Sequence, residues 1–383
     1  MKRQLSVLLL VMLFYLAGCG TIENSLQSEI PQNEETKILQ TIAPKEHSTQ
    51  NPVDENSTFF VHYIDVGQAD AALVLCDNKT MLIDGGNSED SNIIVAYLKK
   101  LNINYIDYMI CSHAHEDHVG GLCGPLSVMS VGKVYAPNTE SISMAYSNFK
   151  RKAADQGLRI QHPTCGDSFN LGSSTVKFLG PVNENDNDLN NTSIVLKITY
   201  GDTSFLFTGD AEQSEENDIM EQNYDLSATV LKVGHHGSEH STSYMFLREV
   251  MPKYAVISVG KNNEYGHPDK STLIRLMNSG AKVFRTDLQG DIVITSNGKT
   301  VSITPEKNAN IDTINITTNN STYSNNIEED TYSGNAQYIG NINTKKFHLP
   351  SCRNLPKESN SIYFSSRDEA INSNYTPCGN CNP

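Results

Sequence analysis

The sequence contains no tryptophan and too little positive charge to balance its acids. Its 383 residues include 29 Lys and Arg against 44 Asp and Glu, which gives a formal net charge of −15 at pH 7. Proteins that bind nucleic acid without regard to sequence do so mainly through lysine and arginine contacts with phosphate groups. The shortage of basic residues therefore excludes broad electrostatic capture of nucleic acid. It does not exclude an anionic substrate at a metal site, where a bound dication would reverse the local charge.

The N-terminal apolar run, residues 5–16, is too short to cross a bilayer comfortably, because a spanning helix needs about 20 such residues. The run follows a basic start and ends in Leu16-Ala17-Gly18-Cys19. This order of features is typical of a cleaved export signal, which we place at residues 1–19. Its last four residues resemble the lipobox of bacterial lipoproteins. The resemblance implies that Cys19 becomes the lipid-modified first residue of an exported protein, anchored to the outer face of the bacterial cell membrane.

Two polar stretches, residues 20–56 and 307–335, divide the rest of the chain. Both are rich in Asn, Ser and Thr and poor in aromatic residues, so neither can bury enough apolar surface to fold alone. We interpret them as linkers. They separate a domain at residues 57–306 from a small C-terminal unit at residues 336–383.

The densest group of potential metal ligands, C-S-H-A-H-E-D-H-V-G-G, spans residues 111–121. It directly follows a segment with strand character, so we expect it on a loop at the end of a buried strand. Imidazole and carboxylate suit Zn²⁺ and also accept Mn²⁺. A pair of such cations lowers the pKa of a bound water molecule toward ~7 and stabilises both oxygens of a displacement. The predicted ligands of two divalent metals in this stretch are His113, His115, Asp117 and His118.

The spacing H-x-H-x-D-H resembles the signature of the metallo-β-lactamase superfamily. The resemblance implies an α/β fold, the αββα sandwich of that superfamily. I-D-V-G-Q-A-D-A at residues 64–71 and L-I-D-G-G at 82–86 are similar to the hydrolase domain of the ComEC-type DNA-uptake proteins. The resemblance implies that Asp84 orients the ligand loop by hydrogen bonds. Asp65 and Asp70 are either ordinary turn acids or functional residues.

Residues 193–198 and 203–207 are predicted to form a hairpin that ends at Asp210. The resemblance implies that Asp210 bridges the two metals. Many members of the superfamily have a histidine shortly before this hairpin, where residues 189–193 read L-N-N-T-S. The ComEC-type domains share this departure. The first metal site is therefore expected to have fewer ligands than in a true β-lactamase.

A third ligand-bearing stretch, G-H-H-G-S at residues 234–238, follows a predicted strand at 227–233. One of its two histidines is expected to bind metal. We favour His235 as the ligand and place His236 against the substrate, with the reverse assignment left open. The hydroxyl groups that follow offer hydrogen bonds to a phosphate or carboxylate oxygen. They belong to Ser238, Ser241, Thr242 and Ser243.

His267 lies on a predicted loop beside two asparagines, after a predicted strand at residues 254–260. A histidine in such a place fits a proton donor or an oxyanion contact, with a ligand role as the alternative. Apolar spacing predicts the remaining elements of the domain. Strands are predicted over 59–66, 71–75, 79–86, 131–135, 175–179, 282–284, 291–295 and 300–304, and helices over 91–101, 141–156 and 271–278.

The C-terminal unit carries two close ligand pairs, His348-x-x-x-Cys352 and Cys378-x-x-Cys381. A closed site of four N and S ligands is typical of structural zinc in a domain too small for a large core. The unit resembles the Ada-type zinc-binding domain. That family usually has cysteine where His348 stands, so its methyl-accepting chemistry is not expected here. The remaining cysteines lack metal spacing and are predicted to be buried small side chains, with a disulfide among them left open: Cys76, Cys111, Cys123 and Cys165.

These features predict an exported metal-dependent hydrolase, in first place a phosphodiesterase that cleaves extracellular DNA by attack of a metal-activated hydroxide. Asp117, His236 and His267 are the predicted catalytic residues. The alternatives are an ester or lactone hydrolase of the same superfamily and a non-catalytic lipoprotein that binds DNA or the cell surface. No nucleotide cofactor is expected.

Overall fold

The computed structural model describes most of the two predicted folded units. The described residues are 59–139, 141–184, 186–314, 338–350, 352–356, 360–364, 367–381 and 383. The predicted signal with Cys19, the first linker and most of the second linker lie outside them. Among the described helices, none combines the length and apolar character that spanning a bilayer requires.

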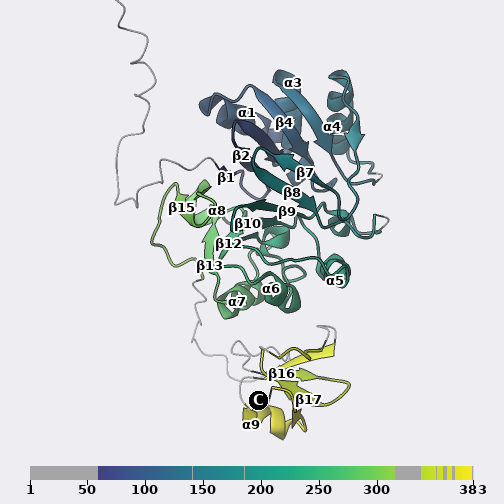
Figure 1. Cartoon of the computed structure of the whole chain (residues 1–383), viewed down its shortest axis with the longest axis vertical. Coiled ribbons are helices and arrows are strands. Elements are labelled where there is room, and N and C mark those ends of the chain that lie inside the picture. The colour runs from purple at the N-terminus through teal and green to yellow at the C-terminus, as the bar shows by residue number, and fades with distance from the viewer. Residues whose placement is uncertain are drawn as a thin grey trace, which may run out of the picture. The chain divides into compact units, whose positions relative to one another are not determined.

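The first layer of the large domain is a mixed sheet of eight strands, covered on one face by α1 (Ser91–Lys100), α3 (Cys123–Val128) and α4 (Met144–Asp155) (Figure 1). The four strands at one end of the sheet, β3 (Lys79–Ile83), β4 (Tyr105–Ile110), β5 (Ser130–Tyr135) and the edge strand β6 (Ile160–Gln161), are parallel. The strand order is β15 (Val301–Pro305), β14 (Ile292–Ser296), β1 (Phe59–Tyr63), β2 (Ala72–Cys76), β3 (Lys79–Ile83), β4 (Tyr105–Ile110), β5 (Ser130–Tyr135) and β6 (Ile160–Gln161).

The second layer is a sheet of seven strands, covered on its outer face by α5 (Gln213–Glu221), α6 (Tyr244–Val250) and α7 (Lys270–Ser279) (Figure 1). Strands β10 to β13 are parallel. The order is β13 (Lys282–Arg285), β12 (Tyr254–Ile257), β11 (Val230–Lys232), β10 (Thr203–Phe207), β9 (Leu196–Tyr200), β8 (Ser174–Phe178) and β7 (Ser168–Leu171). A short helix α8 (Thr286–Gln289) follows β13.

The core is divided between the two faces of each sheet because successive strand residues point in opposite directions. On β10, Phe205 and Phe207 pack between the sheets, whereas Leu206 packs under the helices α5 to α7. On β3, Met81 and Ile83 face the second sheet, whereas Leu82 faces α1. Each such fully buried side chain contributes roughly 1.5–3 kcal/mol. The predicted αββα sandwich is therefore confirmed.

Most predicted elements are present, and the differences have local causes. The hairpin is formed by β9 and β10, with Leu196 opposite Phe207 and a two-residue turn at Gly201 and Asp202. The strand predicted at 227–233 is shorter, because only Val230–Lys232 pairs with both neighbours. Helix α5 was not predicted, because its inward face carries the buried acids Glu215 and Glu216 in place of an apolar stripe.

The C-terminal unit is a sheet of four strands with one helix, α9 (Arg367–Asn372). The strand order is β18 (Ser361–Phe364), β16 (Tyr338–Asn341), β17 (Lys346–His348) and β19 (Thr376–Pro377). Its buried apolar cluster consists of Phe347, Phe364, Ala370 and Tyr375. So small a core supplies little stability, and domains of this size commonly depend on a cross-link or a metal.

Candidate metal centre

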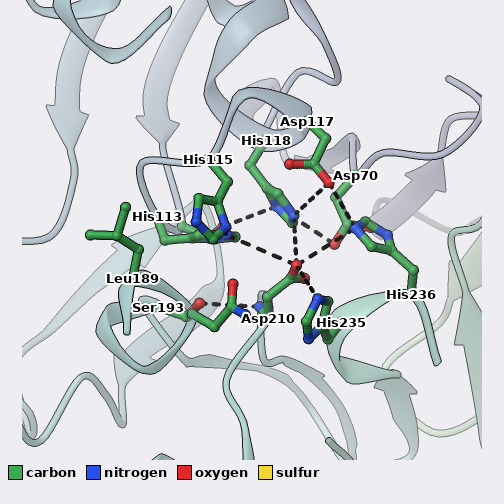
Figure 2. Close-up of polar contacts among 12 residues, drawn as sticks. Asp70, His113, His115, Asp117, His118, Leu189, Ser193, Asp210, His235 and His236 are labelled. Atoms are coloured by element: carbon green, nitrogen blue, oxygen red, sulfur yellow. Dashed lines mark hydrogen bonds and ion pairs between the residues drawn. The ribbon is translucent and has the colours of Figure 1, made fainter. Parts of the chain in front are cut away.

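The predicted ligands lie on loops that leave the sheets at the ends of parallel strands. Residues 111–115 follow β4 and lead into the short helix α2 (Glu116–Val119), which carries Asp117 and His118, while Asp210 follows β10. His235 and His236 follow β11, inside the 3₁₀ turn η4 (Gly234–Gly237). The parallel strands β10 and β11 end at the same edge of the second sheet, and the loop after β4 of the first sheet meets theirs across the two layers, with Nε2 of His118 3.2 Å from Oδ2 of Asp210. Figure 2 shows their side chains converging from separate elements on one point.

The carboxylate of Asp210 is the hub of the cluster. Its Oδ2 lies 3.2 Å from Nε2 of His118, 3.6 Å from that of His236, 3.8 Å from that of His235 and 3.9 Å from that of His113 (Figure 2). The side chain is only 2% exposed. One carboxylate oxygen within 4 Å of four imidazole nitrogens fits the predicted position between two cations.

The side chains of Asp117, His118, Asp210 and His236 each offer a ligand atom, and these atoms lie within 4.8 Å of one another. One buried atom at the centre of this group, Oδ1 of Asp210, has no hydrogen-bond partner within the described parts of the chain. A buried polar atom without a partner costs roughly 1–3 kcal/mol. Coordination to a divalent cation would remove this cost, so the residues present fit a metal. The first two histidines of the motif, His113 and His115, lie beside this group, with Nε2 of His113 3.0 Å from Nδ1 of His115.

The two histidines of η4 lie differently in the site, and both approach Asp210. His236 is 2% exposed, and its Nε2 lies 3.1 Å from Oδ2 of Asp117, so it is inside the ligand cluster. The side chain of His235 is 24% exposed, with Nδ1 3.2 Å from Oε1 of Glu212. Both residues have left-handed backbones, at φ 48° and φ 53°. This conformation costs roughly 1–2 kcal/mol per residue, and such strain gathers at functional sites.

Hydrogen bonds from Asp84 hold the first ligand loop. Its Oδ1 accepts the N–H of Ser112 at 2.7 Å, and its Oδ2 accepts the hydroxyl of Ser112 at 2.7 Å. The same Oδ2 lies 2.9 Å from Nδ1 of His118. Asp84 therefore makes contacts of the kind that the resemblance implied, and it leaves Nε2 of His118 pointing at Asp210.

Two buried residues behind the cluster were missed or left undecided by the sequence. Nζ of Lys232 lies 2.7 Å from Oδ2 of Asp70, and both side chains are less than a tenth exposed. Oδ1 of Asp70 lies 3.3 Å from Nδ1 of His236, which is also 3.0 Å from the carbonyl oxygen of Ser258. Asp70 is thus part of the site. The overlooked signal was a lysine in the middle of the apolar strand V-L-K-V, because lysine is almost never fully buried unless it is paired.

Residues 189–193, which stand where many members of the superfamily have a histidine, hold the loop that carries Asp210. The hydroxyl oxygen of Ser193 accepts the N–H of Asp210 at 3.1 Å. Oδ1 of Asn191 accepts the N–H of Glu212 at 3.1 Å, and Nδ2 of Asn190 donates to Oε1 of Glu212 at 3.3 Å. The neighbouring Leu189 has no atom that could bind a metal (Figure 2). The stretch therefore positions Asp210 and Glu212 and supplies no imidazole.

Electrostatic coupling keeps the carboxylates of the cluster ionised. Burial raises the pKa of Asp210, but His118 and His236 outweigh it and hold this pKa well below its ordinary value. Burial lowers the pKa of His236, but Asp210 and Asp70 prevail and raise it to about 10. Burial and the adjacent His118 together push the pKa of His113 well below its ordinary value. Ionised carboxylates around a buried point favour a cation there.

The prediction that the hydroxyl groups after η4 face a substrate oxygen is wrong, because Ser238, Ser241, Thr242 and Ser243 are all at most 3% exposed. The Thr242 hydroxyl oxygen accepts the N–H of Gly234 at 3.0 Å, and that of Ser243 accepts the N–H of Phe246 at 3.2 Å. The hydroxyl groups of Thr242 and Ser243 therefore shape the loop.

His267 lies beside the cluster, with its ring centroid 5.7 Å from that of His235. Its Nδ1 is buried and has no hydrogen-bond partner among the described residues. Burial, followed by the nearby His235, lowers the pKa of His267 to about 4. The ring is therefore neutral at pH 7 and retains one N–H that can be donated.

The C-terminal unit brings its predicted ligands together. Nδ1 of His348 lies 3.3 Å from Sγ of Cys352, which is 3.9 Å from Sγ of Cys378. With Cys381 they form a group whose ligand atoms lie within 4.8 Å of one another. The seven cysteines among the described residues form no disulfide. Of the four predicted to be buried in the large domain, Cys76 and Cys111 are fully buried, and the other two are partly exposed.

Comparison with known proteins places both units. Residues 64–261 match the model of the metallo-beta-lactamase superfamily, and residues 322–383 match that of the metal binding domain of Ada. ComE operon protein 3 of Bacillus subtilis is 31% identical over 250 residues, which cover 61% of this chain and 32% of that protein. Competence protein ComA of Neisseria gonorrhoeae is 33% identical over 228 residues, which cover 59% and 30%.

Among solved structures, the metallo-beta-lactamase fold protein YhfI from Bacillus subtilis superimposes with a TM-score of 0.44 at 14% identity, over 62% of this chain and 100% of that one. The chain spans about a third of the length of the curated relatives it matches. Residues 64–261, which match the superfamily model, contain the ligand motif, Asp210 and η4. The chain therefore belongs to the metallo-beta-lactamase superfamily and ends in an Ada-type metal-binding domain.

Proposed function

We propose that this protein is an exported, metal-dependent phosphodiesterase that cleaves extracellular DNA. The observation that carries the proposal is the convergence of Asp117, His118, Asp210 and His236 on one buried point at the ends of parallel strands. DNA is the proposed substrate because residues 64–71 resemble the opening of the hydrolase domain of ComEC-type DNA-uptake proteins, and because a relative that matches the same region is named competence protein ComA.

We assign the ligands to two groups that share Asp210. Asp117, His118 and His236 form the second group, and His113, His115 and His235 form the first. His235 then stands in for the missing third histidine, with Glu212 beside its other ring nitrogen. Two divalent cations bound there, zinc in first place or manganese, would lower the pKa of a water molecule and neutralise charge on a phosphate group.

The chain's own groups have separate tasks around a bound phosphodiester. Asp84 and Ser112 fix the ring of His118, and Asp70 fixes that of His236. The carboxylate of Asp117, 30% exposed, faces the open side and can accept a proton from the attacking water. The neutral ring of His267 can donate its N–H to an oxygen of the phosphate.

We further propose that lipid on Cys19 anchors the protein to the outer face of the cell membrane, and that the C-terminal unit holds one structural zinc on His348, Cys352, Cys378 and Cys381. Incorporation of labelled fatty acid tests the anchor. Label should be present in the wild-type protein and absent from Cys19→Ser. Label that persists in Cys19→Ser would contradict it.

The deciding experiment for catalysis combines metal analysis with a nuclease assay. The purified protein should cleave single- or double-stranded DNA with Zn²⁺, Mn²⁺ or Mg²⁺, and Asp117→Ala should lose the activity. Asp155→Ala, which removes an exposed carboxylate on α4, is the matched control and should remain active. Intact DNA under all three metals would reject the proposal, and cleavage of a lactone or ester panel in its place would support the other hydrolase.

A further inference from the structure

We propose that Tyr265 is a stacking platform for an unpaired nucleobase beside the scissile phosphodiester. The inference rests on the proposed function and deepens it by naming single-stranded nucleic acid as the form of the substrate that is bound. It starts from an exposed aromatic side chain. Tyr265 is 74% exposed, although the loop that carries it ends at His267, next to the candidate metal centre.

A continuous series of rings connects Tyr265 with the hub of the cluster. The ring of Tyr265 stacks on that of His267, with centroids 5.8 Å apart and planes 15° from parallel. The ring of His267 meets that of His235 edge-on at 5.7 Å. Nε2 of His235 lies 3.8 Å from Oδ2 of Asp210. One face of Tyr265 is thus packed against the site, which leaves its other face for a flat partner.

The loop is held in a single shape by one side chain. Nδ2 of Asn263 donates to the carbonyl oxygens of Gly260 at 2.9 Å and of His267 at 2.6 Å. Its Oδ1 accepts the N–H of Tyr265 at 3.2 Å and that of His267 at 3.0 Å. Four hydrogen bonds of one asparagine fix the backbone of the loop that carries Tyr265. Little backbone ordering is therefore left to occur on binding, which favours affinity.

The charge of the protein favours a base over a phosphate as the partner of this surface. With a net charge of −15, the chain cannot hold a nucleic-acid backbone by general attraction. Stacking on an aromatic ring needs no positive charge and accepts every base, because each base has a π-face. Bases inside a duplex are already stacked on one another, so Tyr265 requires an unpaired base.

Binding of short fluorescent oligonucleotides, measured by anisotropy, tests the platform independently of catalysis. We expect Tyr265→Ala to weaken binding of a single strand roughly 5- to 150-fold, the range for loss of one base–aromatic stack, and Tyr265→Phe to bind like the wild type. An oligonucleotide whose flanking positions are abasic should bind the wild type and Tyr265→Ala equally. Tyr105→Ala removes a half-exposed ring at the opposite end of β4 and should change nothing.

The outcomes separate this inference from the proposed function. Tyr265-dependent binding without DNA cleavage under any metal would retain the platform and reject the phosphodiesterase. If the protein cleaves DNA and Tyr265→Ala changes neither the KM nor the binding of the single strand, the platform is overturned and the phosphodiesterase is retained. Equal weakening on intact and abasic strands would also overturn it, because the tyrosine would then act on loop structure and not on a base.

Discussion

The buried pair of Lys232 and Asp70 should dominate the stability of the metal-free protein. The two charged atoms lie 2.7 Å apart, and their side chains are 4% and 7% exposed. Lys232 is the nearest of the cationic partners of the buried Asp70 carboxylate, the others being His236 and His118, and loss of one partner of a buried ion pair typically costs about 3–5 kcal/mol. We therefore expect Lys232→Met to lower the free energy of unfolding by about that amount, which corresponds to a fall in Tm of roughly 6–20 °C for a domain of this size.

Removing both charges should cost less than the sum of the two single changes. In Asp70→Asn/Lys232→Met no buried charge is left without its partner, so we expect a coupling energy of about 2 kcal/mol or more. Exposed Lys79 offers a matched control. Its Nζ lies 2.8 Å from Oδ1 of Asp107, but its side chain is 53% exposed. Lys79→Met should therefore cost less than about 1 kcal/mol.

Urea unfolding in the presence of a chelator is the appropriate assay, because it removes metal binding from the comparison. The sequence has no tryptophan, so unfolding is followed by far-UV circular dichroism. Single changes that add to within about 0.5 kcal/mol would refute the reasoning. So would a Lys232→Met protein no less stable than Lys79→Met.

Three other predictions address the metals and the acids. Titration with Zn²⁺ should show one tightly and one more weakly bound cation in the large domain. His236→Ala should abolish binding of the tightly bound cation, and His113→Ala should abolish binding of the weaker one. Loss of both cations from either variant would contradict the two-group assignment. Burial raises the pKa of Glu215 from 4.5 to about 8, so the folded state keeps a proton that the unfolded state releases. The free energy of unfolding should accordingly fall as pH rises from 4.5 to about 8, and urea midpoints of Glu215→Gln should show a flatter profile across that window. Cys378→Ser should lose one zinc per chain by metal analysis and make the C-terminal unit sensitive to protease, whereas unchanged zinc content would exclude that residue as a ligand.

Most residues of the candidate site could be predicted from local sequence, because the metal ligands follow one another closely along the chain. H-x-H-x-D-H places four donors within six residues after a strand, and two cysteine-bearing pairs do the same in the C-terminal unit. Apolar runs also located the two strands of the hairpin, at residues 193–198 and 203–207, and the structure pairs β9 with β10 there. Such patterns can be recognised in the sequence alone, because residues that are close in the chain are also close in the folded structure.

The tertiary structure decided what depends on backbone direction and on contacts between distant segments. Left-handed φ angles turn His236 into the cluster and His235 to its open side, and two adjacent histidines look alike in sequence. The pairing of Lys232 with Asp70 joins strand β11 of the second sheet to the loop between β1 and β2 of the first, so no local sequence pattern predicts it. The sequence determined which residue types are available as ligands. The packing of the two sheets determined which imidazole nitrogen faces which carboxylate oxygen.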